Sequence, residues 1–171
     1  MFDLKDIPRK SNDFYMNEAL KESKKALIFH DVPIGSVIVF DGRIISRAYN
    51  QVEKQNDPTA HAELLAIKKA IKRIGYKHLL NCQLYVTLEP CSMCAGAIVL
   101  SRIEKVIVGT MDPKSGACGS IVNIIQNSSL NHRCDLEFDV LQNECSMIIK
   151  DFFKNLRNLS LIHISEPTRP Y

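Results

Sequence analysis

Two cysteines in this sequence have a spacing that suits metal binding or disulfide chemistry. Cys91 and Cys94 are three positions apart, directly after Pro90. An apolar β-type run at 84–88 precedes them and a helical pattern at 95–102 follows, so Pro90 is expected at the first helical position. Both thiols then lie on one face in the first turn of a helix, where the helix dipole favours the reactive thiolate.

A second motif favours the metal over the disulfide. A lone Cys-x-x-Cys beside a βαβ pattern is typical of redox proteins, but residues 57–63 place His61 and Glu63 at the start of another predicted helix. A catalytic zinc takes three protein ligands and one water, and His61, Cys91 and Cys94 supply the three. Glu63 would lie beside the metal, where a proton shuttle for the bound water is needed.

Two other classes of protein remain as alternatives. A thiol–disulfide protein would use both cysteines but would need neither His61 nor Glu63. A structural zinc module would use four closed protein ligands, and only three are placed here. The combination H-x-E followed by P-C-x-x-C is the established signature of zinc deaminases that act on nucleobases, and it favours a catalytic zinc.

Length and composition indicate a globular chain without a membrane span. The 171 residues, 46% of them hydrophobic, suit one domain, which we place at 1–159. No apolar run reaches about 18 residues, and the first residues lack the order of a signal peptide. Six cysteines without dense spacing indicate reduced thiols and a cytoplasmic location. Four of them have no ligand spacing and are expected to be small core or surface residues: Cys82, Cys118, Cys134 and Cys145.

The first half of the chain alternates helical and β-type patterns. A helix is predicted over 11–29, with Met16, Ala19, Leu20, Ser23 and Leu27 on its apolar stripe. Two β-type runs at 36–40 and 43–49, joined by Asp-Gly, predict a hairpin. A polar loop at 50–57 should follow. A helix over 59–74 is predicted after it, with Leu64, Ile67, Ile71 and Ile74 inward.

The second half should hold a parallel unit and a final helix. Strands at 83–88 and 105–110 flank the helix after the cysteines, which predicts a right-handed βαβ connection. That helix is apolar on nearly every side, so it needs a second layer or a partner chain. The loop at 113–119 should lie at the carboxyl end of its strand, where open α/β sheets place their sites. Three further elements are expected: a helical turn at 121–125, a strand at 134–138 and a helix at 140–159.

Two segments stand apart by composition. No acidic residue occurs between Leu64 and Leu88, so one helix face is purely basic, with Lys68, Lys69, Lys72, Arg73, Lys77 and His78. Such a face is either a solvated helix surface or a patch that faces phosphates. The tail at 160–171 contains two prolines, is predicted to be unstructured and reads like translated vector sequence, so we exclude it from functional reasoning.

The sequence resembles the bacterial tRNA-specific adenosine deaminases over residues 11–158. The resemblance extends well beyond the metal motif to these segments: Val32-Pro33-Ile34-Gly35, Tyr49-Asn50, 56–63, 84–97, Ser101-Arg102-Ile103, Gly109, Asp112, Lys114, Gly116, Asn131-His132-Arg133 and Asp151-Phe152-Phe153. Pro113 and Ser115 depart from the usual loop of that family, and residues 123–130 match it only loosely.

The resemblance implies a fold, a reaction and a set of contacts. The fold would be an α/β, three-layer α/β/α cytidine-deaminase-like arrangement with a five-stranded mixed sheet. The enzyme would be a homodimer with one Zn²⁺ per subunit, converting the wobble adenosine of a tRNA, first of all the arginine tRNA, to inosine. Glu63 would be catalytic. Contacts to the anticodon stem-loop would come from Asn50, Ala62, Leu88, Asp112, Asn131, His132 and Arg133.

The nearest rival is a zinc deaminase of a free base or nucleotide such as cytosine, guanine or deoxycytidylate. The metal motif is common to both groups of enzymes. The basic helix face and the long resemblance favour the tRNA.

Overall fold

The predicted hairpin forms one edge of the sheet. β1 (Gly35–Phe40) and β2 (Arg43–Tyr49) pair antiparallel in the computed structural model, which describes residues 10–164. Asp41 and Gly42 join them with φ of 47° and 72°. A tight type I′ hairpin turn requires positive φ at both central residues, which Asp-Gly tolerates.

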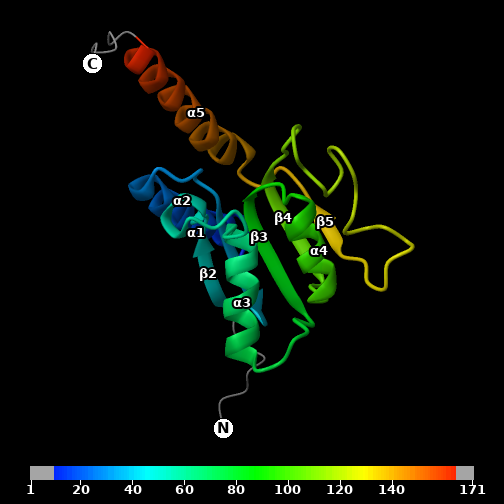
Figure 1. Ribbon diagram of the computed structural model, residues 1–171. Coiled ribbons are helices and arrows are strands. Elements are labelled where there is room, and N and C mark those ends of the chain that lie inside the picture. Colours follow the sequence, from blue (N-terminus) through cyan, green and yellow to red (C-terminus); the bar gives the residue numbers. More distant parts are fainter. Residues whose placement is uncertain (1–9, 165–171) are drawn as a thin grey trace.

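The other strands complete a five-stranded mixed sheet (Figure 1). β3 (Cys82–Leu88) pairs antiparallel with β1 and parallel with β4 (Lys105–Thr110), and β5 (Asp135–Glu137) lies parallel to β4. The strand order is β2-β1-β3-β4-β5. β5 has three residues and is shorter than the predicted strand at 134–138.

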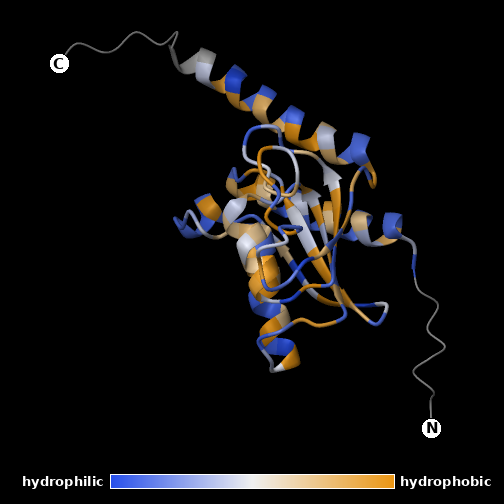
Figure 2. Ribbon diagram, turned by 90° about the vertical axis from the view of Figure 1, so that its right-hand side faces the viewer, coloured by the Kyte–Doolittle hydropathy of each residue, from blue (hydrophilic) through white to orange (hydrophobic). Residues whose placement is uncertain are grey.

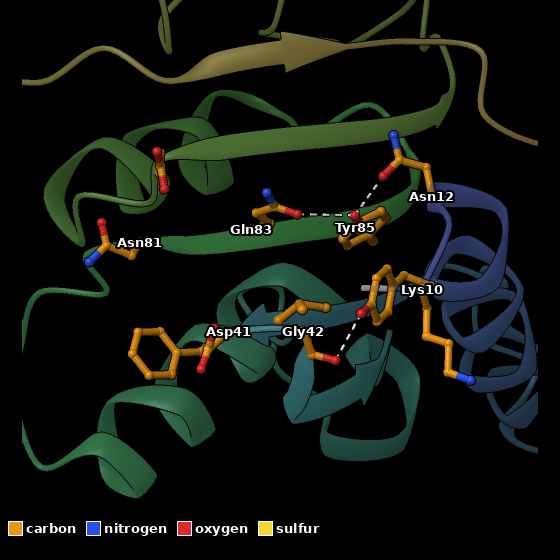
Figure 3. A pocket seen from close by; sticks show the side chains of 11 residues that line it. Lys10, Asn12, Asp41, Gly42, Asn81, Gln83 and Tyr85 are labelled. Carbon is orange, nitrogen blue, oxygen red and sulfur yellow. Dashed lines mark hydrogen bonds between the residues drawn. The ribbon is translucent and has the colours of Figure 1, made fainter. Parts of the chain in front are cut away.

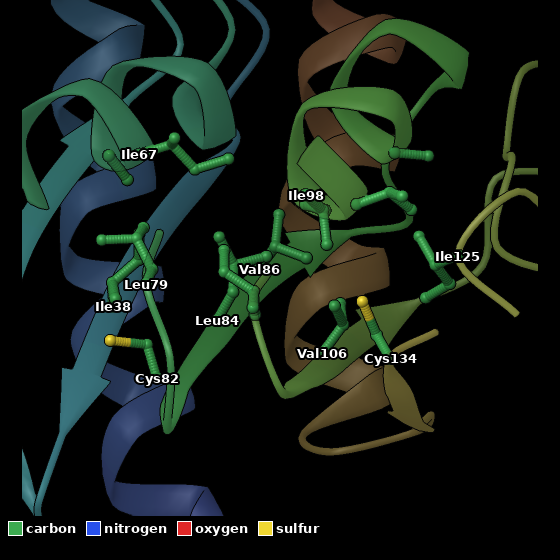
Figure 4. Close-up of a cluster of buried hydrophobic side chains, with 14 of the residues drawn as sticks. Ile38, Ile67, Leu79, Cys82, Leu84, Val86, Ile98, Val106, Ile125 and Cys134 are labelled. Carbon is green, nitrogen blue, oxygen red and sulfur yellow. The ribbon is translucent and has the colours of Figure 1, made fainter. Parts of the chain in front are cut away.

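Helices cover both faces of this sheet, so the three-layer α/β/α prediction is confirmed. α1 (Asn12–Ala26) and α5 (Gln142–Ile164) contribute to one buried cluster with the sheet. α3 (Ala62–Ile74) and α4 (Ser92–Leu100) contribute to the cluster on the opposite face (Figure 4).

The strands divide their side chains between these two clusters because successive residues point to opposite faces. Val37 and Val39 of β1 belong to the α1 side, while Ile38 between them belongs to the α3 side. The larger cluster includes Ile67, Leu79, Leu84, Val86, Ile98, Val106, Ile125 and Cys134, which Figure 4 labels.

Helix α1 is close to its prediction but ends earlier. Ser11 is its N-cap, and the Ser11 hydroxyl oxygen accepts a hydrogen bond from the Phe14 N–H at 3.2 Å. The α-helix stops at Ala26, and residues Leu27–Phe29 continue as the 3₁₀ helix η2. Leu27, predicted on the apolar stripe, lies where α1 ends and η2 begins and is 41% exposed.

Helix α3 starts three residues later than predicted. Asp57 caps a turn before the helix instead, since its carboxylate accepts hydrogen bonds from the Thr59 N–H and hydroxyl. Alanines line much of the buried side, which lets the helix lie close to the sheet: Ala62, Ala66 and Ala70. Of the predicted inward residues, Ile67 is buried, while Ile74 in the last turn is exposed. Gly75 ends the helix with φ 76°, as the sequence predicts.

Two loop predictions were wrong. The polar loop at 50–57 contains a short helix, α2 (Val52–Gln55). Asp31, distant in sequence and buried, accepts hydrogen bonds from the N–H groups of Glu53 and Lys54 at its start. Residues 121–125 form no helical turn; Asn123 instead makes an isolated β-bridge with Cys118.

Helix α5 continues past its predicted end at Leu159 and reaches Ile164, five residues into the segment expected to be unstructured. Its outer half extends beyond the sheet, with hydrophobic and hydrophilic residues alternating along it (Figures 1 and 2). Phe153, Leu156 and Leu159 are exposed there. Residues 165–171 lie outside the described part of the chain, so the foreign origin of the tail stays a prediction.

Within residues 10–164, none of the helices has the length and apolar character needed to cross a membrane.

Candidate metal centre

The starts of two helices bring the predicted ligands together. His61 is the N-cap of α3 and Cys91 is the N-cap of α4, while Cys94 is the third residue of α4. The sequence predicts Pro90 as the first helical residue. This prediction was wrong, because Pro90 precedes the N-cap Cys91. Neither N-cap side chain makes a capping hydrogen bond to a backbone N–H of its own helix, so both are available to a ligand.

The three donor atoms form a compact set. His61 Nδ1 lies 3.6 Å from Cys91 Sγ and 3.6 Å from Cys94 Sγ. All three donor atoms are within 4.8 Å of one another. Cys94 is fully buried, while His61 and Cys91 are half-buried, so the cluster is reached from the side of the latter two.

This geometry fits zinc. With Zn–N of about 2.0–2.1 Å and Zn–S of about 2.3 Å, a tetrahedral zinc separates its nitrogen and sulfur ligands by about 3.6 Å. The observed nitrogen–sulfur separations match this value. One nitrogen and two sulfurs are also a donor set that zinc prefers, and three ligands leave the fourth position open for water. The dipoles of α3 and α4 both favour the negative thiolates.

Glu63 lies in the first turn of α3, two residues after His61, with 3% of its surface exposed. Burial penalises the charged carboxylate and raises the pKa of Glu63 to about 7, against an opposing hydrogen bond from its own backbone and the nearby His61. A carboxyl group with this pKa exchanges protons readily near neutral pH.

The two cysteines have opposite pKa shifts. A hydrogen bond from the Cys94 thiol, together with the contact to His61, lowers the pKa of Cys91 to about 4. The pKa of Cys94 is raised, because its proton is shared with the Cys91 thiolate and because the thiol is buried. The hydrogen bond to Cys91 likewise raises the pKa of His61.

The other four cysteines take no part in this cluster. Cys82, Cys118, Cys134 and Cys145 are all buried, as predicted for small core residues, and all six cysteines are free thiols. Burial raises the pKa of each of the four.

Three of the expected substrate contacts lie next to the ligands along the chain. Ala62 follows His61, and Leu88 ends the strand that leads to Cys91. Asn50 follows β2 and is buried; the next N–H, of Gln51, donates to the Ala60 carbonyl at 2.9 Å, directly before His61. The end of β2 is thereby tied to the turn that carries the histidine.

The other four expected contacts lie in loops. The Asp112 carboxylate accepts hydrogen bonds from the N–H groups of Lys114 and Ser115, so it caps its own turn. His132 Nε2 is 2.6 Å from the carbonyl oxygen of Ile103, which fixes its loop. Their neighbours Asn131 and Arg133 are exposed. In the structure, Asp112 and His132 thus make contacts that hold their own loops.

One buried acid next to the ligands was overlooked in the sequence. Glu89 lies two residues before Cys91, is 2% exposed, and accepts hydrogen bonds from the loop after β4. Its donors are more than 20 residues away, so the only local signal is a charged residue directly after an apolar strand.

The basic face of α3 is partly used by the fold itself. Lys69 Nζ donates to the Arg47 carbonyl at 2.8 Å, and Arg73 donates to the Ile45 carbonyl at 3.3 Å. These two side chains therefore bind backbone carbonyls of the edge strand β2 and attach α3 to it. Lys68 and Lys72 remain on the exposed face.

A polar cavity of about 580 Å³ lies at the opposite end of the sheet (Figure 3). It is lined where β1 ends and β3 begins, by residues that include Phe40 and Gln83. Two hydrogen bonds join residues that line the cavity. The Tyr15 hydroxyl donates to the Gly42 carbonyl, and the Tyr85 hydroxyl donates to the Asn12 side chain. None of the metal-site residues lines it, so it is separate from the site.

The fold and the donor set together define the class of metal-dependent deaminases of nucleobases. Residues 10–157 match the sequence model of the MafB19-like deaminases. The tRNA-specific adenosine deaminase of Aquifex aeolicus is 51% identical over 146 residues, which cover 85% of this chain and 96% of that protein. The chain belongs to the family of tRNA-specific adenosine deaminases.

Two solved structures give the same fold. A structure from studies of A-to-I editing by tRNA:A34 deaminases at the wobble position superposes with a TM-score of 0.76 and 41% identity, covering 79% of this chain and 98% of that chain. The guanine deaminase of Bacillus subtilis superposes with a TM-score of 0.57 and 38% identity, covering 60% of this chain and 66% of that chain.

Proposed function

We propose that this protein is a zinc-dependent deaminase that converts the wobble adenosine of a tRNA, in the first place the arginine tRNA, to inosine. The observation that carries the proposal is the cluster of His61, Cys91 and Cys94, with buried Glu63 two residues from the histidine. The identity with tRNA-specific adenosine deaminases over most of the chain supports the choice of substrate.

The chain's own residues supply the proton transfers of the reaction. Zinc held by the histidine and the two thiolates would supply an activated water as the nucleophile at C6 of the adenine. Glu63 takes a proton from that water and passes it to N1 of the base. Glu63 then takes the remaining proton from the hydroxyl group now on C6 and gives it to the departing amino group, so the C6–N bond breaks, ammonia leaves and the C6 carbonyl of inosine forms. A pKa of about 7 suits a group that must both accept and donate.

The substrate base must leave its stack to reach the metal. Unstacking costs a few kcal/mol and costs least in an unpaired loop, which favours an anticodon loop over a duplex. We assign contacts to this loop to the residues that border the ligands or lie in the loops after β4: Asn50, Ala62, Leu88, Asp112, Asn131, His132 and Arg133.

The active form is proposed to be a homodimer with one zinc in each subunit. Met93 and Leu100 are seven positions apart and therefore lie on one stripe of α4; Met93 is half-buried and Leu100 is 79% exposed. An apolar helix face of this kind is typical of a subunit interface. Reduced thiols and a tRNA substrate support a cytoplasmic location.

The experiment compares substrates on one zinc-loaded sample. An arginine-tRNA anticodon stem-loop with wobble adenosine is incubated beside free adenosine, cytidine and guanine. A second stem-loop carries its only adenosine in the paired stem. We expect inosine only in the first stem-loop, because only there is an adenosine both unpaired and presented by RNA.

The second candidate is a deaminase of a free base, which the similarity to a guanine deaminase favours. Turnover of free guanine or cytidine without inosine in any stem-loop would establish this candidate in place of the first.

A further inference from the structure

The carboxylate of Glu89 is buried at the point where β3 turns toward the metal ligands. It follows Leu88, the last residue of β3, and precedes Pro90 and Cys91. The Glu89 N–H donates to the Thr110 carbonyl at 2.9 Å, which ties it to the end of β4. A buried carboxylate is costly unless hydrogen bonds compensate for the lost water.

All the hydrogen-bond donors to this carboxylate come from the loop after β4, which we call the 112–120 loop. One oxygen, Oε2, accepts from the Asp112 N–H at 2.9 Å and from the Ser120 hydroxyl. The other, Oε1, accepts from the N–H groups of Cys118 and Ser120, each at 3.0 Å. A carboxylate accepts at both oxygens, whereas a glutamine side chain would accept at one and place a donor against N–H groups at the other.

The same loop is packed against Glu89 and against the ligand turn. A Cβ at Gly116 would lie 2.3 Å from Glu89 Oε2, so only glycine allows this approach. Gly116 also pairs with Cys91 in an isolated β-bridge, and the Ala117 N–H donates to the Pro90 carbonyl at 2.8 Å. The 112–120 loop therefore lies directly beside the turn that carries a metal ligand.

We propose that Glu89 is a positioning residue that holds the 112–120 loop, and with it Asp112, at the entrance to the metal site in the conformation that binds RNA. This inference rests on the proposed function, in which Asp112 contacts the anticodon loop. The metal ligands and Glu63 are carried by α3 and α4, so loosening the loop should weaken substrate binding more than the chemical step.

The first test replaces Glu89 by its neutral isostere in the full-length, zinc-loaded enzyme. We expect Glu89→Gln to raise KM for the anticodon stem-loop about tenfold or more, since it disrupts several hydrogen bonds to one charged group. We expect kcat to change by less than about threefold and the zinc content to stay the same, because no metal ligand is touched. The matched control is Glu104→Gln, at an exposed position before β4.

A second variant disturbs the same contact from the loop side. Gly116→Ala should reproduce the rise in KM, since its added methyl group displaces the loop from the carboxylate. Ser120→Ala should have a smaller effect in the wild type and none in Glu89→Gln, because both act through one interaction. A parallel loss of zinc and kcat in Glu89→Gln would overturn the proposal and assign Glu89 to the metal site itself.

A readout without substrate separates this inference from the proposed function. Lys114 is exposed within the 112–120 loop, so trypsin cleavage after Lys114 reports how firmly the loop is held. Cleavage should be faster in Glu89→Gln than in the wild type and in Glu104→Gln. Equal cleavage rates overturn the role of Glu89. Faster cleavage in a protein that forms no inosine in the stem-loop supports Glu89 as the loop anchor and overturns the proposed function alone.

Discussion

At the scale of single residues, the site depends on two helix N-caps that do not cap. A Ser or Asp at such a position would bond to the first turn of its own helix. His61 and Cys91 make no such bond to a backbone N–H, and both are directed to the same point, 3.6 Å apart. The chain thus gives up two helix caps and gains two candidate metal ligands.

Zinc content tests the ligand assignment. Cys91→Ser should lower the zinc content from about one per chain to a small fraction, since only two protein ligands remain. Cys82→Ser is the control, because Cys82 is also a free thiol but lies at the start of β3, far along the strand from the candidate ligands. Elemental analysis of both variants after dialysis measures the zinc content per chain, which should be low in Cys91→Ser and unchanged in Cys82→Ser. Wild-type zinc content in Cys91→Ser would refute its role.

Burial of Glu63 predicts a pH-dependent stability in the zinc-free protein. The folded state raises the Glu63 pKa from 4.5 to about 7, so the protonated form stabilises the fold below about pH 4.5, and this contribution is lost as the pH rises to about 7. Since one pKa unit is about 1.4 kcal/mol, the loss is about 3 kcal/mol.

Glu63→Gln should remove this dependence because glutamine stays neutral. Zinc-free Glu63→Gln should therefore exceed the zinc-free wild type by about 3 kcal/mol in unfolding free energy at pH 8, and the two should converge near pH 4. Urea unfolding at both pH values measures this difference, with the exposed Glu144→Gln as control. A constant difference between wild type and Glu63→Gln at the two pH values contradicts the assigned burial.

The clustering of His61, Cys91 and Cys94 could be predicted from sequence because each residue belongs to a local motif, and the structure brings the two motifs together. Glu89 and Asp31 could not be assigned roles in this way. Their hydrogen-bond donors lie about 20 to 30 residues away, and no local pattern encodes a contact of that range.

At the scale of elements, close approach between helix and sheet fixes the frame of the site. Residues on the sheet side of α3 are mostly alanines, and α1 approaches β1 at Gly35. A Cβ at Gly35 would lie 1.9 Å from the Ala19 carbonyl oxygen and 2.5 Å from the Ser23 nitrogen. Backbone atoms of α1 occupy that space and cannot rotate away as a side chain would.

Gly35→Ala should therefore destabilise the fold by about 3 kcal/mol, at the upper end of overpacking costs. Gly75→Ala is the comparison. The φ of 76° at Gly75 is strained for alanine, but a Cβ built there meets no neighbouring atom within 4 Å. This variant should therefore lose only about 1–2 kcal/mol of unfolding free energy. Thermal unfolding of the two zinc-loaded variants gives the order. Equal destabilisation would contradict the close approach of α1 to β1.

The elements themselves were largely predictable, and their exceptions have physical causes. The hairpin, β3, β4 and their helices follow from periodicity and from Asp-Gly and Gly at turns. The short helix α2 was missed because its start is bonded to Asp31 from a distant loop. The start of α3 was placed at Thr59 because Asp57 is an equally good cap for a turn and for a helix.

At the scale of the whole molecule, the outer stripe of α4 requires an explanation that one chain does not provide. Leu100 is 79% exposed on a helix that is apolar on nearly every side. Leu100→Lys should convert the proposed dimer to a monomer at micromolar concentration, since it would bury a charge in the interface. Sedimentation velocity measures this change.

The matched control for the dimer is Met147→Lys, at a position 61% exposed on α5, on the other face of the sheet. This variant should remain a dimer. If the wild type already sediments as a monomer, the assignment of α4 to a subunit interface is refuted.

The central claim is that this metal site, with Glu63, deaminates a wobble adenosine. It is tested most directly by a single-turnover reaction of zinc-loaded wild type and Glu63→Gln with the arginine-tRNA anticodon stem-loop, with zinc determined on the same samples. We predict one zinc per chain in both proteins, inosine at the wobble position with the wild type, and a rate at least about 100-fold lower for Glu63→Gln. Equal rates for the two proteins, or no inosine from the zinc-loaded wild type, would contradict the account.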